Sequence, residues 1–193
     1  TALTAREILS NAPQGGVMKI LYDVRYTWSA KQVVEKFGGV PMMSKVGHAF
    51  ISEALRKEQG VFAGESSGHY FFRDTGYAEG PLLVLLHVLR VLAREKRPFS
   101  EIIAPLVSAY ESGEVNFHLK TREEVQPVLA SLEERYKDGA ISKLDGIAIE
   151  FPDWRFSVRA SNTEPLLRLN IERKTNEIVK EKKQELINVI KTQ

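Results

Sequence analysis

The sequence contains no cysteine among its 193 residues, and only three methionines and two tryptophans. Without cysteine the chain can form no disulfide bond, no thiolate nucleophile and no cysteine-ligated zinc site. Long apolar runs are also missing, since the longest, residues 81–88, is interrupted by His87 and is shorter than the about 20 residues that cross a bilayer. No basic and apolar leader opens the chain. These absences predict a cytoplasmic protein without a membrane partner.

The chain has no large excess of charge of either sign. It carries 27 basic and 25 acidic residues, which leaves a net charge of +2. A charge this small produces no strong field for binding a polyanion, so we expect no nucleic-acid partner. With 43% hydrophobic and 27% charged residues, the composition is that of an ordinary globular protein. At about 150 residues per domain, the length corresponds to one or two domains.

The first part of the chain alternates apolar strands with amphipathic helices, which favours an α/β domain with a mixed or parallel sheet flanked by helices. Residues 81–94 predict a helix that is apolar on nearly all sides, and we expect it to be buried against the sheet. The other elements expected here are strands at residues 17–24, 40–43 and 61–64 and helices at residues 3–10, 29–37 and 48–58.

A different pattern begins near Gly113 and predicts a smaller α+β domain. Residues 114–119 alternate polar and apolar side chains, as a half-buried antiparallel strand does. Thr121 and Glu124 have the spacing of a capping box at the start of a helix that runs to Tyr136. Further strands at residues 146–151, 154–159 and 166–172 and a closing helix at 175–192 complete an antiparallel sheet with helices on one face. We therefore expect two domains, residues 1–112 and 113–193, with a hinge near residues 111–113.

The segment Gly-Glu-Ser-Ser-Gly-His at residues 64–69 places a carboxylate, two hydroxyls and an imidazole between two glycines. Glycine lets the backbone approach a ligand closely. Carboxylate and hydroxyl groups match a sugar, because each sugar hydroxyl both donates and accepts a hydrogen bond. A plain turn between two strands would use the same residue types, so on spacing alone both interpretations stand.

A second polar segment, Arg-Ala-Ser-Asn-Thr-Glu-Pro at residues 159–165, lies between two predicted strands. The planar guanidinium of Arg159 matches phosphate oxygens, and hydroxyl, amide and backbone N–H groups of a tight loop can complete an anion site. A hairpin loop without a ligand is the alternative. Two shorter segments also lie where strands end. Residues 23–25 lie at the edge where α/β sheets bind ligands, and an ordinary charge pair at a strand end is the alternative. In the Lys-Val-Gly-His run at 45–48, His48 opens a helix at which a nearby anion is favoured, although taken alone this segment favours a solvent-facing helix start.

Taken together, these four segments resemble the C-terminal half of the α-D-phosphohexomutase superfamily, most closely its phosphomannomutase/phosphoglucomutase branch. The Asp-Val-Arg run resembles the start of the family's third domain, and residues 45–48 its KxGH segment. Residues 64–69 match the GExSGH sugar-binding loop, and residues 159–165 match the RxSNTxP phosphate loop of the fourth domain. The resemblance covers nearly the whole chain and implies a second domain like TATA-binding protein in fold.

The resemblance implies reversible transfer between hexose 1-phosphate and hexose 6-phosphate, through a phosphorylated serine and a hexose 1,6-bisphosphate. The mannose or glucose phosphate would be held by both domains. Asn162 favours the mannose/glucose branch, because the phosphoglucosamine branch more often has glycine there. The implied sugar-binding residues are Glu65, Ser67, His69, His48, Arg25 and Lys45, and the implied phosphate-binding residues are Arg159, Ser161, Asn162 and Thr163.

Two family motifs are absent from the sequence: the phosphoserine loop, similar to TASHNP, and the DGDxDR loop that binds magnesium. Phosphoryl transfer depends on positioning and on metal neutralising the phosphate oxygens. We therefore expect no catalytic residue and no magnesium ligand in this chain, which would be an inactive fragment whose partners are the missing N-terminal domains 1 and 2. A stand-alone phosphosugar-binding or regulatory module and a nucleic-acid-binding module are the alternatives, the latter disfavoured by the near-neutral charge.

Overall fold

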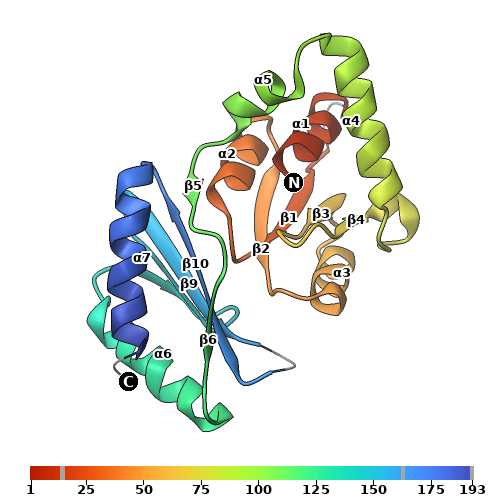
Figure 1. The fold of residues 1–193 in the computed structure, drawn as a ribbon. Coiled ribbons are helices and arrows are strands. Elements are labelled where there is room, and N and C mark those ends of the chain that lie inside the picture. Colours follow the sequence, from red (N-terminus) through yellow and green to blue (C-terminus); the bar gives the residue numbers. More distant parts are fainter. Residues whose placement is uncertain (14–15, 162–163, 192–193) are drawn as a thin grey trace. The chain divides into compact units, whose positions relative to one another are not determined.

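The structure is a computed structural model that describes residues 1–13, 16–161 and 164–191, with the backbone alone at 176–178. The chain divides into two compact units, Thr1–Ser108 and Ala109–Gln193 (Figure 1). The first is an α/β unit with a mixed sheet and the second an α+β unit with an antiparallel sheet, so the predicted fold class is confirmed. No helix within the described ranges is long and apolar enough to cross a membrane.

The sheet of the first unit consists of four strands in the order β2-β1-β3-β4. The central strand β1 runs parallel to β2 and to β3, and β3 pairs with β4 in an antiparallel hairpin. Because the three parallel strands end at the same edge, the loops that follow them are brought together there. The strands are β1 (Lys19–Asp23), β2 (Val40–Ser44), β3 (Phe62–Gly64) and β4 (Tyr70–Phe72).

Helices cover both faces of this sheet (Figure 1). On β1, Ile20 packs with residues of α1 and α2, whereas its neighbour Leu21 packs with residues of α3. Successive side chains of a strand point to opposite faces, so one apolar strand supplies both cores. The helices are α1 (Ala2–Ser10), α2 (Trp28–Lys36), α3 (His48–Lys57), α4 (Pro81–Glu95) and α5 (Phe99–Ile103), with 3-10 turns η1 (Arg73–Thr75) and η2 (Ala104–Leu106).

The prediction that α4 is buried is wrong. Leu82 is 65% exposed, and Leu85, Leu86 and Leu89 are each about half exposed. One side of the helix, which carries the partly buried Leu83 and Val84, packs against the hydrophobic core that α1 and α2 form with the sheet. A helix at the border of a sheet has neighbours on one side alone, and composition does not reveal on how many sides a helix is covered.

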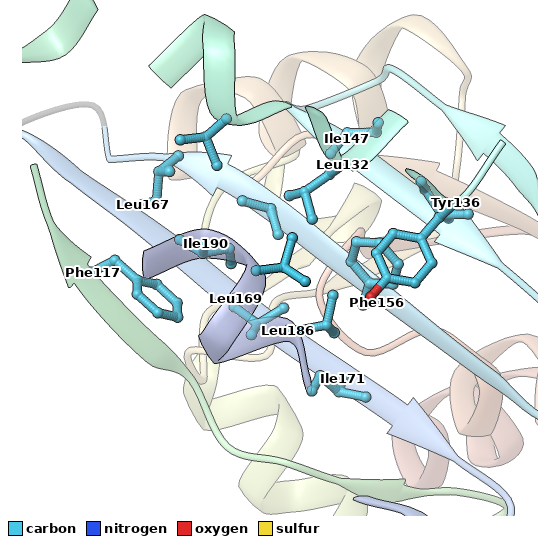
Figure 2. Packing of buried hydrophobic residues seen from close by; sticks show 14 of the residues in the cluster. Phe117, Leu132, Tyr136, Ile147, Phe156, Leu167, Leu169, Ile171, Leu186 and Ile190 are labelled. Atoms are coloured by element: carbon cyan, nitrogen blue, oxygen red, sulfur yellow. The ribbon is translucent and has the colours of Figure 1, made fainter. Parts of the chain in front are cut away.

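The second unit is built on an antiparallel sheet in the order β5-β10-β9-β8-β7, with β6 also paired to β10. Helices α6 and α7 cover one face of this sheet. The alternate residues Leu167, Leu169 and Ile171 of β10 point into the core between the sheet and these helices (Figure 2). The elements are β5 (Tyr110–Glu111), β6 (Val115–His118), η3 (Arg122–Glu124), α6 (Val125–Arg135), β7 (Ala140–Ser142), β8 (Ile147–Glu150), β9 (Trp154–Ala160), β10 (Leu166–Arg173) and α7 (Asn176–Lys191).

The capping box predicted from Thr121 and Glu124 is not formed. The first turn is the 3-10 turn η3, and Thr121 makes no side-chain cap hydrogen bond there. Instead, the Lys120 backbone N–H donates to the Glu124 carboxylate at 3.0 Å. The tighter turn moves the α-helix start to Val125, so the Thr–Glu spacing no longer coincides with the cap positions.

Helix α4 is joined to α1 by ion pairs. Buried Glu7 accepts two hydrogen bonds from Arg94, both at 2.8 Å, and Arg6 donates to Glu95 at 2.7 Å. The hydrogen bond from Arg94 and the positive charges of Arg94 and Arg6 lower the pKa of Glu7, although burial opposes this. A lowered pKa stabilises the folded unit above the pKa of an unfolded glutamate, about 4.3, and this stability is lost as the pH falls through the folded value.

We predict that Glu7→Gln lowers the free energy of unfolding at pH 7 by about 1.5–3 kcal/mol, the range for hydrogen bonds to charged groups. The loss should lie at the low end because Arg94 is half exposed. Urea titrations from pH 7 to below pH 4 measure the effect, with exposed Glu53→Gln as the control. The difference between wild type and Glu7→Gln should shrink as the pH falls, and a difference that stays constant contradicts the assignment.

Candidate functional site

The carboxyl edge of the first sheet is organised by Asp23, the last residue of β1, which is 1% exposed. Its carboxylate accepts hydrogen bonds from the Arg25 backbone N–H at 2.8 Å and from Arg25 Nη2 at 2.7 Å. It also accepts from the Ser66 backbone N–H at 2.6 Å and from Ser66 Oγ at 3.1 Å. One buried carboxylate therefore joins the loop after β1 to the loop after β3.

The loop at residues 64–69 is a tight turn. The Glu65 N–H donates to the His69 carbonyl at 2.8 Å, and the Gly68 N–H donates to the Glu65 carbonyl at 3.0 Å. Gly68 has φ +92°, a conformation that residues with a Cβ rarely adopt. The second glycine of the motif is thus required by the backbone, which keeps the turn compact between β3 and β4.

Glu65 is 3% exposed and contacts both neighbouring loops. Its Oε1 accepts from the Gly47 N–H at 2.8 Å and lies 3.8 Å from Arg25 Nη2. Exposed Ser67 receives a hydrogen bond from Arg25 Nη2 at 3.2 Å, and its own hydroxyl lies 3.5 Å from Glu65 Oε2. The structure thus brings together three residues that the sequence predicted as sugar-binding, Arg25, Glu65 and Ser67. Together with Asp23 and Ser66 they form the carboxyl-edge cluster.

The two predicted histidines lie beside each other, with ring centroids 5.9 Å apart, and we call them the histidine pair. Both are largely exposed, and both contact one carboxylate that the sequence analysis did not identify, Glu79. Hydrogen bonding to His69 is the main cause of the lowered pKa of Glu79. Lys45 is exposed, and its Nζ lies 5.7 Å from the centre of the Phe50 ring rather than in the carboxyl-edge cluster.

The second unit holds the predicted phosphate-binding residues at the end of β9. Arg159 and Ser161 are 4% and 7% exposed, whereas Asn162 and Thr163 lie outside the described residues. Arg159 is directly opposite Arg168 on β10, and Arg168 Nη2 lies 3.4 Å from Ser161 Oγ. The carboxylate of Glu114 lies 3.9 Å from Arg159 and 3.6 Å from Arg168, so two guanidinium groups share one carboxylate.

Sequence reasoning missed Glu79, Arg168 and Glu114. Arg168 interrupts the apolar residues of β10, and this interruption was a signal that its side chain lies on the polar face of the sheet. Glu114 stands at the start of an alternating strand and resembles any exposed strand residue. Glu79 precedes an apolar helix, and its place beside the histidine pair depends on how the chain turns after β4.

A metal ion does not fit the residues that the structure describes. No group of three or more histidine, aspartate or glutamate side chains is placed there to hold one. Glu79 and the histidine pair contact each other, but their facing atoms form hydrogen bonds with one another.

Comparisons with known proteins show the family of the chain. The model of phosphoglucomutase/phosphomannomutase, alpha/beta/alpha domain III, matches residues 1–110, and that of the C-terminal domain of the same family matches residues 114–189. The chain belongs to the phosphoglucomutase/phosphomannomutase family, within the phosphohexomutase superfamily that its motifs predicted.

Similar proteins are considerably longer than this chain. It is 38% identical to a phosphomannomutase of Methanocaldococcus jannaschii, in an alignment that covers 98% of this chain and 41% of that protein. It is 41% identical to a phosphomannomutase of Vibrio cholerae, in an alignment that covers 90% of this chain and 38% of that protein. A phosphoglucomutase/phosphomannomutase family protein from Burkholderia thailandensis has a similar structure, with a TM-score of 0.81, 30% identity, and coverage of 99% of this chain and 40% of that one. The chain thus spans about two fifths of these relatives.

We predict that Asp23→Asn destabilises the first unit, because asparagine has the same shape but turns an amide donor toward the Ser66 or Arg25 donors. Removing one partner of a buried ion pair costs about 3–5 kcal/mol, and we expect about 3 here because Glu65 still faces Arg25. Urea unfolding measures the loss. The matched control Asp74→Asn changes a side chain that is 90% exposed and should alter stability by less than about 0.5 kcal/mol. Equal stabilities of the two variants contradict this role.

Proposed function

We propose that this chain is the substrate-binding half of a phosphomannomutase/phosphoglucomutase that interconverts hexose 1-phosphate and hexose 6-phosphate. The observation that carries the proposal is the carboxyl-edge cluster, in which hydrogen bonds hold Arg25, Glu65 and Ser67, and the bond from Arg25 to Asp23 is buried. Family membership and the names of the similar phosphomannomutases support the reaction class. Residues 1–112 would bind the sugar and residues 113–193 the phosphate.

The sugar ring would be recognised by alternating acceptors and donors. The Glu65 carboxylate accepts from ring hydroxyls, and the Ser67 hydroxyl can both donate and accept. Because Glu65 is fixed by the Gly47 N–H, its oxygens have a defined direction before a ligand arrives. Arg25 keeps its positive charge at every physiological pH and supplies electrostatic attraction, not proton transfer. His48, His69 and Lys45 complete the proposed sugar-binding set.

The phosphate would be bound by Arg159, Ser161, Asn162 and Thr163, and we add Arg168 because it lies opposite Arg159. In the structure Glu114 places a carboxylate near both guanidinium groups. A phosphate group that reaches the two arginines would compete with this carboxylate. Guanidinium groups bind phosphate in a bidentate manner, which lysine cannot reproduce.

Turnover would require parts that this chain does not contain. The sequence has neither the phosphoserine motif nor the magnesium motif of the family, and the described residues do not fit a metal ion. Solved structures of Aspergillus fumigatus N-acetylphosphoglucosamine mutase contain glucose 1,6-bisphosphate, or GlcNAc-6P with magnesium, although at 15% identity they are evidence for the fold alone. We therefore propose that N-terminal domains 1 and 2 supply these parts and that the chain alone is inactive.

The proposed function is tested by titrating the 193-residue chain with glucose 6-phosphate and mannose 6-phosphate while NMR follows its amide resonances. We expect a dissociation constant of about 1 mM, since charged contacts worth about 1.5–3 kcal/mol each are opposed by the cost of association. The amides of residues 64–69 and of Arg159 should shift, and glucose without phosphate should bind more weakly. Shifts confined to other segments contradict the proposal.

Two substitutions in the second unit should change affinity in opposite directions. Arg159→Lys should weaken binding, because lysine loses the planar fork, whereas Glu114→Gln should strengthen it by about 1.5- to 5-fold, the effect of removing a competing ion pair of about 0.2–1 kcal/mol. The same NMR titration measures both, with Glu133→Gln on α6 as the control. Loss of folding would weaken binding in both variants. Weaker binding by Arg159→Lys together with stronger binding by Glu114→Gln would therefore be an effect on the phosphate site itself.

A further inference from the structure

Glu79 connects the two histidines through both of its carboxylate oxygens. Its Oε1 lies 2.8 Å from His69 Nδ1, and its Oε2 lies 3.2 Å from His48 Nε2. The three residues come from separate segments: His48 opens α3, His69 precedes β4, and Glu79 precedes α4. A single carboxylate thus joins the KxGH and GExSGH segments, to neither of which it belongs.

The backbone fixes this arrangement. The segment before α4 runs antiparallel to β4, with Glu79 bridged to Phe71 and the Gly80 N–H donating to the Tyr70 carbonyl at 2.8 Å. The His48 ring packs edge-on against the Phe71 ring at 4.8 Å. Because the backbone and the aromatic contact hold the segments in place, the contacts of Glu79 do not depend on side-chain rotamers alone.

The chemistry of a carboxylate restricts the protonation of both rings. Glu79 is ionised at neutral pH, because the ordinary pKa of a glutamate is about 4.3 and hydrogen bonding to His69 lowers the pKa of Glu79 further. An ionised carboxylate can only accept hydrogen bonds, so each ring nitrogen that faces it must carry a proton. In neutral imidazole the other nitrogen is then bare and accepts. His69 would carry its proton on Nδ1 and His48 on Nε2.

We propose that Glu79 is a positioning residue that sets the tautomers of His48 and His69, so that His69 Nε2 and His48 Nδ1 are acceptors for sugar hydroxyls. The part that concerns the sugar rests on the proposed function, whereas the tautomers are a property of the chain without ligand. His69 is the diagnostic ring, since a free histidine side chain prefers its proton on Nε2. A merely structural Glu79 would leave this preference unchanged.

The test is nitrogen-15 NMR of the histidine side chains in the 193-residue chain, at a pH about two units above the ordinary imidazole pKa of about 6.5. The ring-nitrogen shifts report directly which atom carries the proton. In the wild type, His69 should be protonated mainly on Nδ1. Glu79→Ala should move the proton toward Nε2, and Glu79→Asp, which keeps a carboxylate, should restore part of the wild-type state.

Glu79→Gln gives a sharper result. Its amide can accept from one ring but must donate to the other, so the two histidines cannot both keep the wild-type tautomer. The matched control is Glu58→Gln, which removes a carboxylate of similar exposure that pairs with Lys19 at 2.9 Å, and it should leave both rings unchanged. A wild-type His69 protonated mainly on Nε2 overturns the proposal, even if no variant folds. The proposal is also overturned if both histidines keep their wild-type tautomers in Glu79→Gln.

Adding glucose 6-phosphate separates this proposal from the proposed function. Shifts of His69 Nε2 and His48 Nδ1 on binding support the acceptor role. Shifts of the Ser66, Ser67 and Arg159 amides without a change at either ring would overturn the acceptor role and remove both histidines from the proposed sugar-binding set, while the proposed binding of the phosphosugar stands. If no resonance moves although the wild-type tautomers are as expected, the proposed function fails while the positioning of the histidines by Glu79 stands.

Discussion

The carboxylate of Asp23 is the interaction on which the candidate sugar site depends. A buried charge must be satisfied by donors, and Asp23 accepts four hydrogen bonds, two from Arg25 and two from Ser66. Both donor residues belong to loops that carry proposed ligand-binding side chains. The need to satisfy this charge therefore positions Arg25 and the loop at residues 64–69 at the same edge of the sheet.

The topology of the first unit makes such a cluster possible. Strands β1, β2 and β3 run parallel, so the loops that follow them lie side by side, and each contributes one part. The loop after β1 supplies Arg25, the loop after β2 supplies the Gly47 N–H, and the loop after β3 supplies Glu65. If one of these strands ran in the opposite direction, the group that follows it would lie at the other edge of the sheet, away from the other two.

Sequence reasoning found the residues of this edge but not every contact among them. Arg25, Glu65 and Ser67 were predicted as sugar-binding because their motifs resemble those of the phosphohexomutase family, whereas residue types and spacing alone also allowed a plain turn. Glu79 could not be predicted, since its contact with the histidine pair depends on the path of the chain after β4. The exposure of α4 was also missed, because an apolar composition does not tell which sides of a helix have neighbours. Strands as short as β5 and β7 leave no periodicity to detect.

The central claim, that buried Asp23 holds the loop at residues 64–69, is tested most directly by hydrogen exchange of the Ser66 backbone amide. Ser66 is an exposed residue, but its N–H donates to Asp23 Oδ2 at 2.6 Å. We expect its exchange to be slowed by orders of magnitude relative to an unstructured peptide, as for amides that open only with local unfolding. Exchange of the Ser66 amide at the unstructured rate, while the amides of β1 stay protected, would contradict the account.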